Sequence, residues 1–378
     1  MIRKDQEPLP FTLEEVCGML GVNPHKRICP ICGGRTSFSV SLQKGVWHCF
    51  KCDNKGNAIS LYAQVQGVDN KEAFKQIMNA LNKGFKPDVK TTQADEGRTE
   101  SDANLADIDT RDAVYSAMLS FGLDEAHQKE MASRGMKNAE RYFATLDLQG
   151  WEQRSAYTKK LMEQGLHLRG VPGFYKNKYG WTIKATKRGI LVPYRAFDGK
   201  VQGIQIRKDS NLLKTFEDGS VESKYTWLSS GWIPKSAEKD SGTRARAFVH
   251  YAVDFRTTYD GRKLPTFKNN TVYLTEGGMK AQIAHELSGH AYIAVPGVNA
   301  LSDFAKELKK LHDIGVMRII NAYDMDYLTN PNVQEAVNKT KQIITDLGFE
   351  YNRLSWEDVR PDLKGIDDFL ADYRSRVG

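Results

Sequence analysis

The sequence of 378 residues has no long apolar run. No stretch approaches the roughly 18 apolar residues that a membrane-spanning helix needs, and the first 15 residues contain no apolar segment typical of a secretory signal. Hydrophobic residues make up 40% and charged residues 27% of the chain, which excludes collagen-like and wholly disordered proteins. We therefore expect a cytoplasmic, globular protein of two or three domains without a membrane partner.

Cysteine is scarce, and five residues are an odd number for a disulfide framework. Four of them form two CxxC pairs, Cys29/Cys32 and Cys49/Cys52, with 16 residues between the pairs. Two such pairs can place four thiolates tetrahedrally around one structural Zn²⁺ ion, whereas the alternatives are free thiols or a redox motif. The fifth cysteine, Cys17, lies at apolar spacing in a predicted helix and is expected in the core.

The residues around the two pairs predict a zinc ribbon. Residues 36–49 alternate polar and apolar side chains around a Lys44-Gly45 turn, which is typical of a β-hairpin. His48 adjoins Cys49 and could compete as a ligand, but the CxxC geometry favours the thiolates. Helical spacing precedes the first pair and follows the second, so that the small domain closes near residue 83.

The rest of the chain predicts an α/β architecture. Residues 84–111 carry few large apolar side chains and many acidic ones, as expected of a flexible linker. Helical patterns and an Asp198-Gly199 hairpin follow, and from Thr271 short strands alternate with helices, which predicts a parallel sheet. The expected domains are a zinc ribbon (1–83), the linker (84–111), a helical and basic α+β subdomain (112–270) and a parallel-sheet domain (271–378).

Charge is unevenly distributed. Residues 150–250 hold 19 lysines and arginines against 9 acidic residues, whereas residues 271–378 hold 12 against 16. The basic block is either a solvated face or a track for a polyanion such as single-stranded DNA. Its aromatic residues could stack unpaired bases, although each is more often a core residue, and Tyr225 is the one we favour.

Acidic residues follow two predicted strands of the last domain. Glu276 ends one strand, and Asp324 and Asp326 end another. Because functional groups of parallel sheets gather at the carboxyl ends of the strands, these carboxylates are expected to converge. Converging carboxylates favour a hard divalent cation such as Mg²⁺ or Mn²⁺, and the alternative is that they are solvated strand-end acids.

These motifs, in this order, resemble DnaG-type DNA primases, and the LTEGG and AYDMD segments resemble a TOPRIM domain in particular. The segment from Cys29 to Tyr62 resembles the zinc-binding domain of those primases, and residues 188–209 with 224–230 resemble their basic subdomain. No GxxxxGK[ST] phosphate loop is present, so no fused helicase is expected. This short arrangement of motifs, without a helicase domain, is similar to that of primase-like proteins of phages, plasmids and integrated elements.

The resemblance implies an enzyme that makes short RNA primers on a single-stranded DNA template from ribonucleoside triphosphates, with a replicative helicase acting in trans. Its catalytic and magnesium-binding residues would be Glu276, Asp324 and Asp326, joined by Asp367 and less securely by Asp368. The resemblance places Arg207 and Lys224 at basic positions that bind nucleotide or template. The aromatic side chains of Tyr225 and Trp47 could bind template bases, and Phe50, which follows Cys49 in the second CxxC pair, is a further candidate.

Two departures from the primase pattern leave alternatives open. The ribbon has four cysteines where bacterial primases usually have Cys-His-Cys-Cys, and Lys280 stands four residues after Glu276, where an acid is usual. A lysine there removes one carboxylate from the metal site. The alternatives are a TOPRIM nuclease and a non-catalytic single-stranded DNA binding or loading factor; a topoisomerase would need a larger chain.

Overall fold

A computed structural model describes most of the chain, and its contacts divide the protein into two units, Met1–Gly97 and Arg98–Gly378. The described residues are 10–24, 27–32, 38–42, 44–82, 104–184, 187–216, 221–234, 236–297, 301, 303–325 and 331–377. The predicted catalytic residue Asp326 and most of the predicted linker lie outside them. No helix among the described residues is long and apolar enough to cross a membrane.

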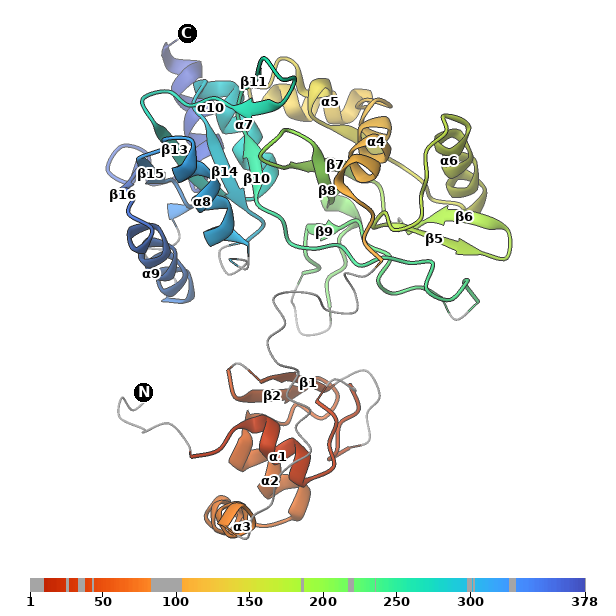
Figure 1. Cartoon of the computed structure of the whole chain (residues 1–378), viewed down its shortest axis with the longest axis vertical. Helices are drawn as coiled ribbons and strands as arrows, with labels where there is room; N and C mark the ends of the chain where they lie inside the picture. Colours follow the sequence, from red (N-terminus) through yellow and green to blue (C-terminus); the bar gives the residue numbers. More distant parts are fainter. Residues whose placement is uncertain are drawn as a thin grey trace. The chain divides into compact units, whose positions relative to one another are not determined.

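The described residues of the first unit form a three-stranded antiparallel sheet and three helices, which lie together in Figure 1. The predicted hairpin is confirmed, since β1 and β2 pair antiparallel and Gly45 in the turn has a φ of 63°. Cys17 lies fully buried in the core of the unit, as expected. The elements are α1 (Leu13–Met19), β1 (Phe38–Ser41), β2 (Val46–Cys49), β3 (Lys55–Asn57), α2 (Ala58–Gln66) and α3 (Asn70–Asn82).

The second unit begins with helices and an antiparallel sheet in the order β4-β7-β8-β9. Strands β7 and β8 form the predicted hairpin, and Gly199 in its turn has a φ of 82°. The elements of this part are α4 (Ile108–Leu119), α5 (Glu125–Ser133), β4 (Ala144–Leu146), α6 (Trp151–Glu163), β5 (Phe174–Asn177), β6 (Gly180–Ile183), β7 (Gly189–Arg195), β8 (Val201–Lys208) and β9 (Tyr225–Trp227).

The rest of the second unit contains a five-stranded sheet in the order β10-β14-β13-β15-β16 and a separate two-stranded sheet, β11-β12. The predicted parallel sheet is confirmed, because β14, β13, β15 and β16 run parallel, and β10 adds an antiparallel edge strand from before residue 271. The elements are β10 (His250–Ala252), β11 (Phe255–Thr257), β12 (Lys263–Pro265), β13 (Thr271–Glu276), α7 (Gly278–Ser288), β14 (Tyr292–Val295), α8 (Phe304–Asp313), β15 (Arg318–Asn321), α9 (Pro331–Asp346), β16 (Glu350–Arg353) and α10 (Ile366–Val377).

Helices cover both faces of the five-stranded sheet (Figure 1). Alternate strand residues point to opposite faces: Ile293 packs in the cluster that includes side chains of α8 and α9, and Ala294 in the cluster that includes α7 and the first residue of α10. Helix α7 also packs against the antiparallel sheet, where Ile283 joins Ile190 and Val192 of β7 in one core cluster. The beginning of α7 is therefore fixed between the two sheets, next to the end of β13.

Candidate functional site

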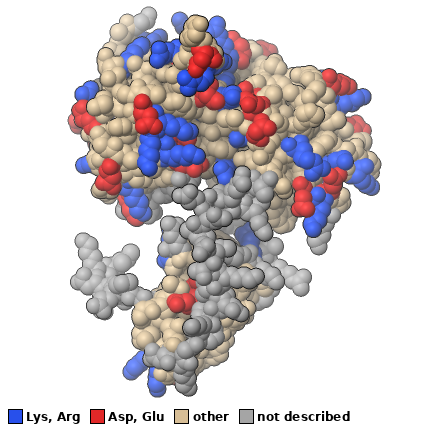
Figure 2. All heavy atoms as spheres, viewed as in Figure 1, with Lys and Arg blue, Asp and Glu red and all other residues tan. Residues whose placement is uncertain are grey.

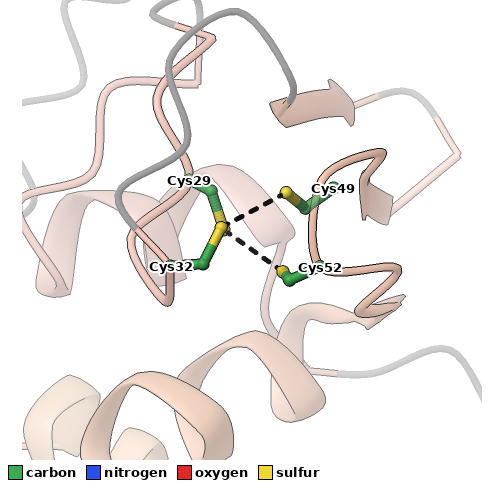
Figure 3. Close-up of side chains that lie close together, drawn as sticks. All are labelled: Cys29, Cys32, Cys49 and Cys52. Atoms are coloured by element: carbon green, nitrogen blue, oxygen red, sulfur yellow. Dashed lines mark hydrogen bonds between the residues drawn. The ribbon is translucent and has the colours of Figure 1, made fainter.

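The four cysteines of the two CxxC pairs converge in the first unit (Figure 3). All four sulfur atoms lie within 4.8 Å of one another, with 3.9 Å between Cys29 and Cys52 and 3.8 Å between Cys32 and Cys49. A tetrahedral ion with Zn–S bonds of about 2.3 Å requires sulfur atoms about 3.8 Å apart. Burial raises the pKa of the Cys29 thiol to about 12, so a bound cation must drive its deprotonation. The site fits one structural Zn²⁺ ion.

The residues next to the zinc site divide into a buried and an exposed set. His48 Nε2 lies 2.8 Å from Asp53 Oδ1, so its polar contact is with a carboxylate. The predicted DNA contact Trp47 is 2% exposed and donates from Nε1 to the carbonyl oxygen of Asn57 over 3.0 Å. Phe50 is 66% exposed, which leaves its ring open to solvent.

The predicted carboxylates meet at the carboxyl edge of the five-stranded sheet. Glu276 is the last residue of β13, and Asp324 follows its parallel neighbour β15. Asp367 is the second residue of α10 and belongs to the same group, because its charge acts on Lys280 together with the charges of Glu276 and Asp324. Asp324 is 6% and Asp367 is 4% exposed, so both carboxylates are removed from bulk water.

Two basic side chains, Lys280 and Arg134, contact the carboxylates of this group. Lys280 of α7 forms an ion pair with Asp324, and its Nζ lies 3.7 Å from Oε1 of Glu276. Arg134 Nη2 lies 3.3 Å from Oδ2 of Asp367. Burial lowers the pKa of Lys280, but the carboxylates of Asp324, Glu276 and Asp367 more than offset this and raise it, so the amine is charged at neutral pH.

Whether a divalent ion fits depends on which part of the group is considered. Oδ1 of Asp367 is buried and has no hydrogen-bond partner, which leaves an oxygen acceptor for a cation. The absence of a side chain at Gly365 makes room for the Asp367 carboxylate, since a Cβ atom at residue 365 would lie 2.5 Å from Oδ1 of Asp367 and 3.4 Å from Cε of Lys280. Hard carboxylate oxygens are the ligands that Mg²⁺ prefers. Asp367 thus offers an oxygen that a divalent ion could use, whereas an ammonium group already lies between Glu276 and Asp324. Among the described residues, the four cysteines alone lie close enough together to form a metal site of three or more ligands.

Three of the predicted nucleotide-binding residues, Arg207, Lys224 and Tyr225, lie near the charged side chains of the carboxylate group. Burial and the charges of Arg207 and Arg134 lower the pKa of Lys224, which indicates a positive environment. Tyr225, 36% exposed, places its hydroxyl 3.7 Å from Sδ of Met279 in the first turn of α7. Both terminal guanidinium nitrogens of the buried Arg207 side chain, Nη1 and Nη2, donate hydrogen bonds to the carboxylate of Glu130 in α5, so this guanidinium group already has a partner.

Much of the basic block is neutralised by acidic residues. The ion pairs of residues 169–208 include acids within the block and acids before it: Arg169 and Lys176 with Glu238, Lys187 and Lys208 with Glu222, Arg188 with Asp124 and Asp209, and Lys200 with Asp109. Figure 2 shows both signs of charge interspersed over the visible face. A local positive environment at Lys224 is therefore better supported than a uniformly basic track.

Arg134 is the residue that the sequence analysis missed. It contacts Asp367, and its Nη1 lies 3.8 Å from Sδ of Met279, which Tyr225 also contacts. It lies just beyond the end of α5 in an ordinary amphipathic segment, so no local pattern marks it. Only the packing of α5 against α7 and α10 reveals it.

Family models match two segments of the chain. Residues 20–93 match the CHC2 zinc finger of DnaG, and residues 266–376 match a domain of unknown function, DUF3854. The first match covers the four cysteines, and the second covers Glu276, Asp324 and Asp367. The first assigns the ribbon to a primase-type family, while the second carries no stated activity.

Curated relatives bear the name DNA primase. The protein of Geobacillus stearothermophilus is 41% identical over 51 residues, which are 13% of this chain and 8% of the relative. That of Listeria innocua is 24% identical over 309 residues, 79% of this chain and 45% of the relative. The chain thus spans less than half the length of the curated relatives it matches.

Similar solved structures include the zinc-binding and RNA polymerase domains of the Aquifex aeolicus primase, with 17% identity, a TM-score of 0.47, and 97% of this chain and 82% of that chain covered. The RNA polymerase domain of Mycobacterium tuberculosis primase DnaG has 17% identity and a TM-score of 0.43, with 71% and 83% covered. The family model for the ribbon and the curated names together confirm the resemblance of this chain to DnaG-type DNA primases.

Proposed function

We propose that this chain is a DNA primase, which synthesises short RNA primers on single-stranded DNA by metal-dependent nucleotidyl transfer. The observation that carries the proposal is the meeting of buried carboxylates with a positive environment at one sheet edge, where Lys280 contacts Asp324 and Arg134 contacts Asp367. Such a mixture can hold a nucleoside triphosphate and a cation together. The chain also contains a ribbon that matches a primase-type family model.

In primer synthesis a 3′-hydroxyl attacks the α-phosphate of the incoming nucleotide in line with the leaving pyrophosphate. A bound Mg²⁺ or Mn²⁺ ion would offset the charge of the phosphates and orient them. Asp367 is the described carboxylate that would hold it, Asp326 is proposed as a further ligand, and the contributions of Asp324 and Glu276 depend on Lys280.

The positive side chains would bind the triphosphate and the template. Lys224 lies in the positive environment beside Arg134, and the half-buried Tyr225 borders it, so we assign both to nucleotide or template contact. Arg207 would contribute by position, because Glu130 already occupies its guanidinium group. In the ribbon, the exposed ring of Phe50 is better placed than the buried Trp47 to stack on a template base.

The decisive experiment measures incorporation of labelled ribonucleotides on single-stranded DNA with Mg²⁺ or Mn²⁺. The full chain is compared with an Asp324→Ala/Asp326→Ala variant and with an Asp313→Ala control, which changes an exposed acid of the same unit. Short RNA products from the full chain and the control, lost in the double variant, would support the primase.

Normal product yield from the double variant would refute the proposed metal site, and two other results would reject the primase in favour of a named alternative. Metal-dependent loss of the template strand would identify a nuclease. Tight binding of DNA without any product, on several templates and with a replicative helicase added, would identify a non-catalytic binding or loading factor.

A further inference from the structure

Lys280 occupies a cation position within the carboxylate group. It lies in the first turn of α7, directly after the β13 strand that ends in Glu276, and its side chain is only 18% exposed. Its ammonium group pairs with Asp324 and lies 3.7 Å from Glu276, two carboxylates that approach from different strands. Two acids that would otherwise repel each other are thus joined through one positive charge.

The surroundings hold this ammonium group in place. Gly365 lies close to the Lys280 side chain, since a Cβ atom built there would be 3.4 Å from Cε. On the far side of Asp324, Lys364 Nζ lies 3.8 Å from Oδ2. Asp324 therefore has a cationic partner near each of its carboxylate oxygens, with the closer contact made by Lys280.

The charge balance limits how many divalent ions the group can take. Four described carboxylates, those of Glu276, Asp324, Asp367 and Asp368, are met by three cations, Lys280, Arg134 and Lys364. Repulsion between an ammonium group and a dication a few ångströms apart is strong where water is partly excluded. Among the described carboxylates of this group, Asp367 has the one oxygen, Oδ1, that is buried without a hydrogen-bond partner. This oxygen lies in the part of the group around Asp367, not in the part between Glu276 and Asp324.

We propose that the Lys280 ammonium is a built-in cation that takes the place of a divalent ion between Glu276 and Asp324. The group then binds one divalent ion fewer than its carboxylates alone would bind, with that ion on the side of Asp367. This inference extends the proposed function. It rests on that function only in assuming that a divalent ion takes part in nucleotidyl transfer.

The experiment is a Mn²⁺ titration of the zinc-loaded full chain, with free Mn²⁺ measured by electron paramagnetic resonance and with neither nucleotide nor DNA present. We compare the wild type with Lys280→Gln, which removes the charge, and Lys280→Arg, which keeps it. Lys310→Gln is the matched control, because Lys310 pairs with Glu307 on α8 over 2.7 Å in the same unit. We expect Lys280→Gln to gain a site or to bind Mn²⁺ about ten-fold more tightly, with Lys280→Arg and Lys310→Gln unchanged.

Two results would overturn the proposal: an unchanged titration for Lys280→Gln, or an equal gain for Lys280→Arg, which would show that charge is not the cause. A third variant covers the case in which Lys280→Gln does not fold. Glu276→Gln should change Mn²⁺ affinity less than two-fold, since Glu276 faces Lys280 instead of the ion, and a ten-fold loss would make Glu276 a ligand and refute the proposal. Because no primer is made in this assay, failure of the primase proposal is detected separately.

Discussion

Arg134 Nη2 lies 3.3 Å from Oδ2 of Asp367 and 3.6 Å from Oδ1 of Asp368, which ties the residue following α5 to the first turn of α10. Segments more than 200 residues apart in the sequence are joined at this contact. The same guanidinium group contacts Met279 in the first turn of α7, so Arg134 helps to hold together the two elements that carry the buried charges of the site. Its role is therefore both structural and electrostatic.

Replacement of Arg134 by methionine should lower the free energy of unfolding by about 1–3 kcal/mol, because the buried carboxylate of Asp367 loses its counter-charge. Urea unfolding of the full chain measures this. The double variant Arg134→Met/Asp367→Asn should recover at least part of the loss, since a neutral amide needs no counter-charge. A double variant that is less stable than either single variant would contradict this account of the pair.

A methyl group at residue 365 should disturb the carboxylate group directly. The added Cβ of Gly365→Ala would lie 2.5 Å from Oδ1 of Asp367, so the carboxylate or the loop must move. We expect primer synthesis and Mn²⁺ affinity each to fall about ten-fold or more, as for other small displacements of catalytic groups. Gly150→Ala is the control, because its added Cβ meets nothing within 4 Å. Equal values for both variants would show that the position of Asp367 does not matter.

Zinc content should depend on the CxxC cysteines alone. Cys49→Ser should lose the ion and expose residues 10–82 to trypsin, since a site that closes the ribbon also stabilises its fold. Cys17→Ser should retain one zinc ion per chain, because Cys17 is a core residue and is not one of the four cysteines whose sulfur atoms converge. Metal analysis and limited proteolysis test both variants. A zinc-free Cys17→Ser protein, or a Cys49→Ser protein with full zinc content, would contradict the assignment.

The sequence predicts the parts of the site that follow local or topological rules. Spacing alone identifies the four cysteines, and the rule that functional groups follow parallel strands brings Glu276 and Asp324 together. Strand β10 is not predicted from the sequence, because a strand of three residues is too short to show an alternation of polar and apolar side chains. Its pairing with β14 is visible only in the folded structure. The domain boundaries remain predictions, as do the catalytic roles.

Side-chain partners are where sequence patterns give no information. Arg207 bonds Glu130, which lies 77 residues away, and Lys280 pairs with Asp324, 44 residues away. No motif encodes either of these sequence separations. Arg207, which the sequence predicts to contact nucleotide or template, is therefore found in an ion pair with Glu130. The expectation that Trp47 faces DNA meets the same difficulty, since an aromatic side chain beside a zinc knuckle can point either way and this one is buried.

His250 should make the second unit sensitive to mild acid. It is fully buried on β10, where its Nδ1 accepts a hydrogen bond from the backbone of Arg195 over 2.9 Å, and burial lowers its pKa from 6.5 to about 3. The unfolded chain gains a proton at this residue below pH 6.5 while the folded chain does not, so stability is full above that pH and decreases as the pH falls toward 3. Between pH 7 and pH 5 this residue should cost about 2 kcal/mol.

The contribution of His250 is isolated by comparison with His250→Gln, which cannot titrate. Urea unfolding at pH 7 and pH 5 should show a loss for the wild type that exceeds the loss for the variant by about 2 kcal/mol, because the carboxylates titrate equally in both. Nitrogen chemical shifts of the His250 imidazole supply a direct check that needs no variant. They should remain those of a neutral ring at pH 5, and a protonated ring in the folded protein at that pH would refute the assignment.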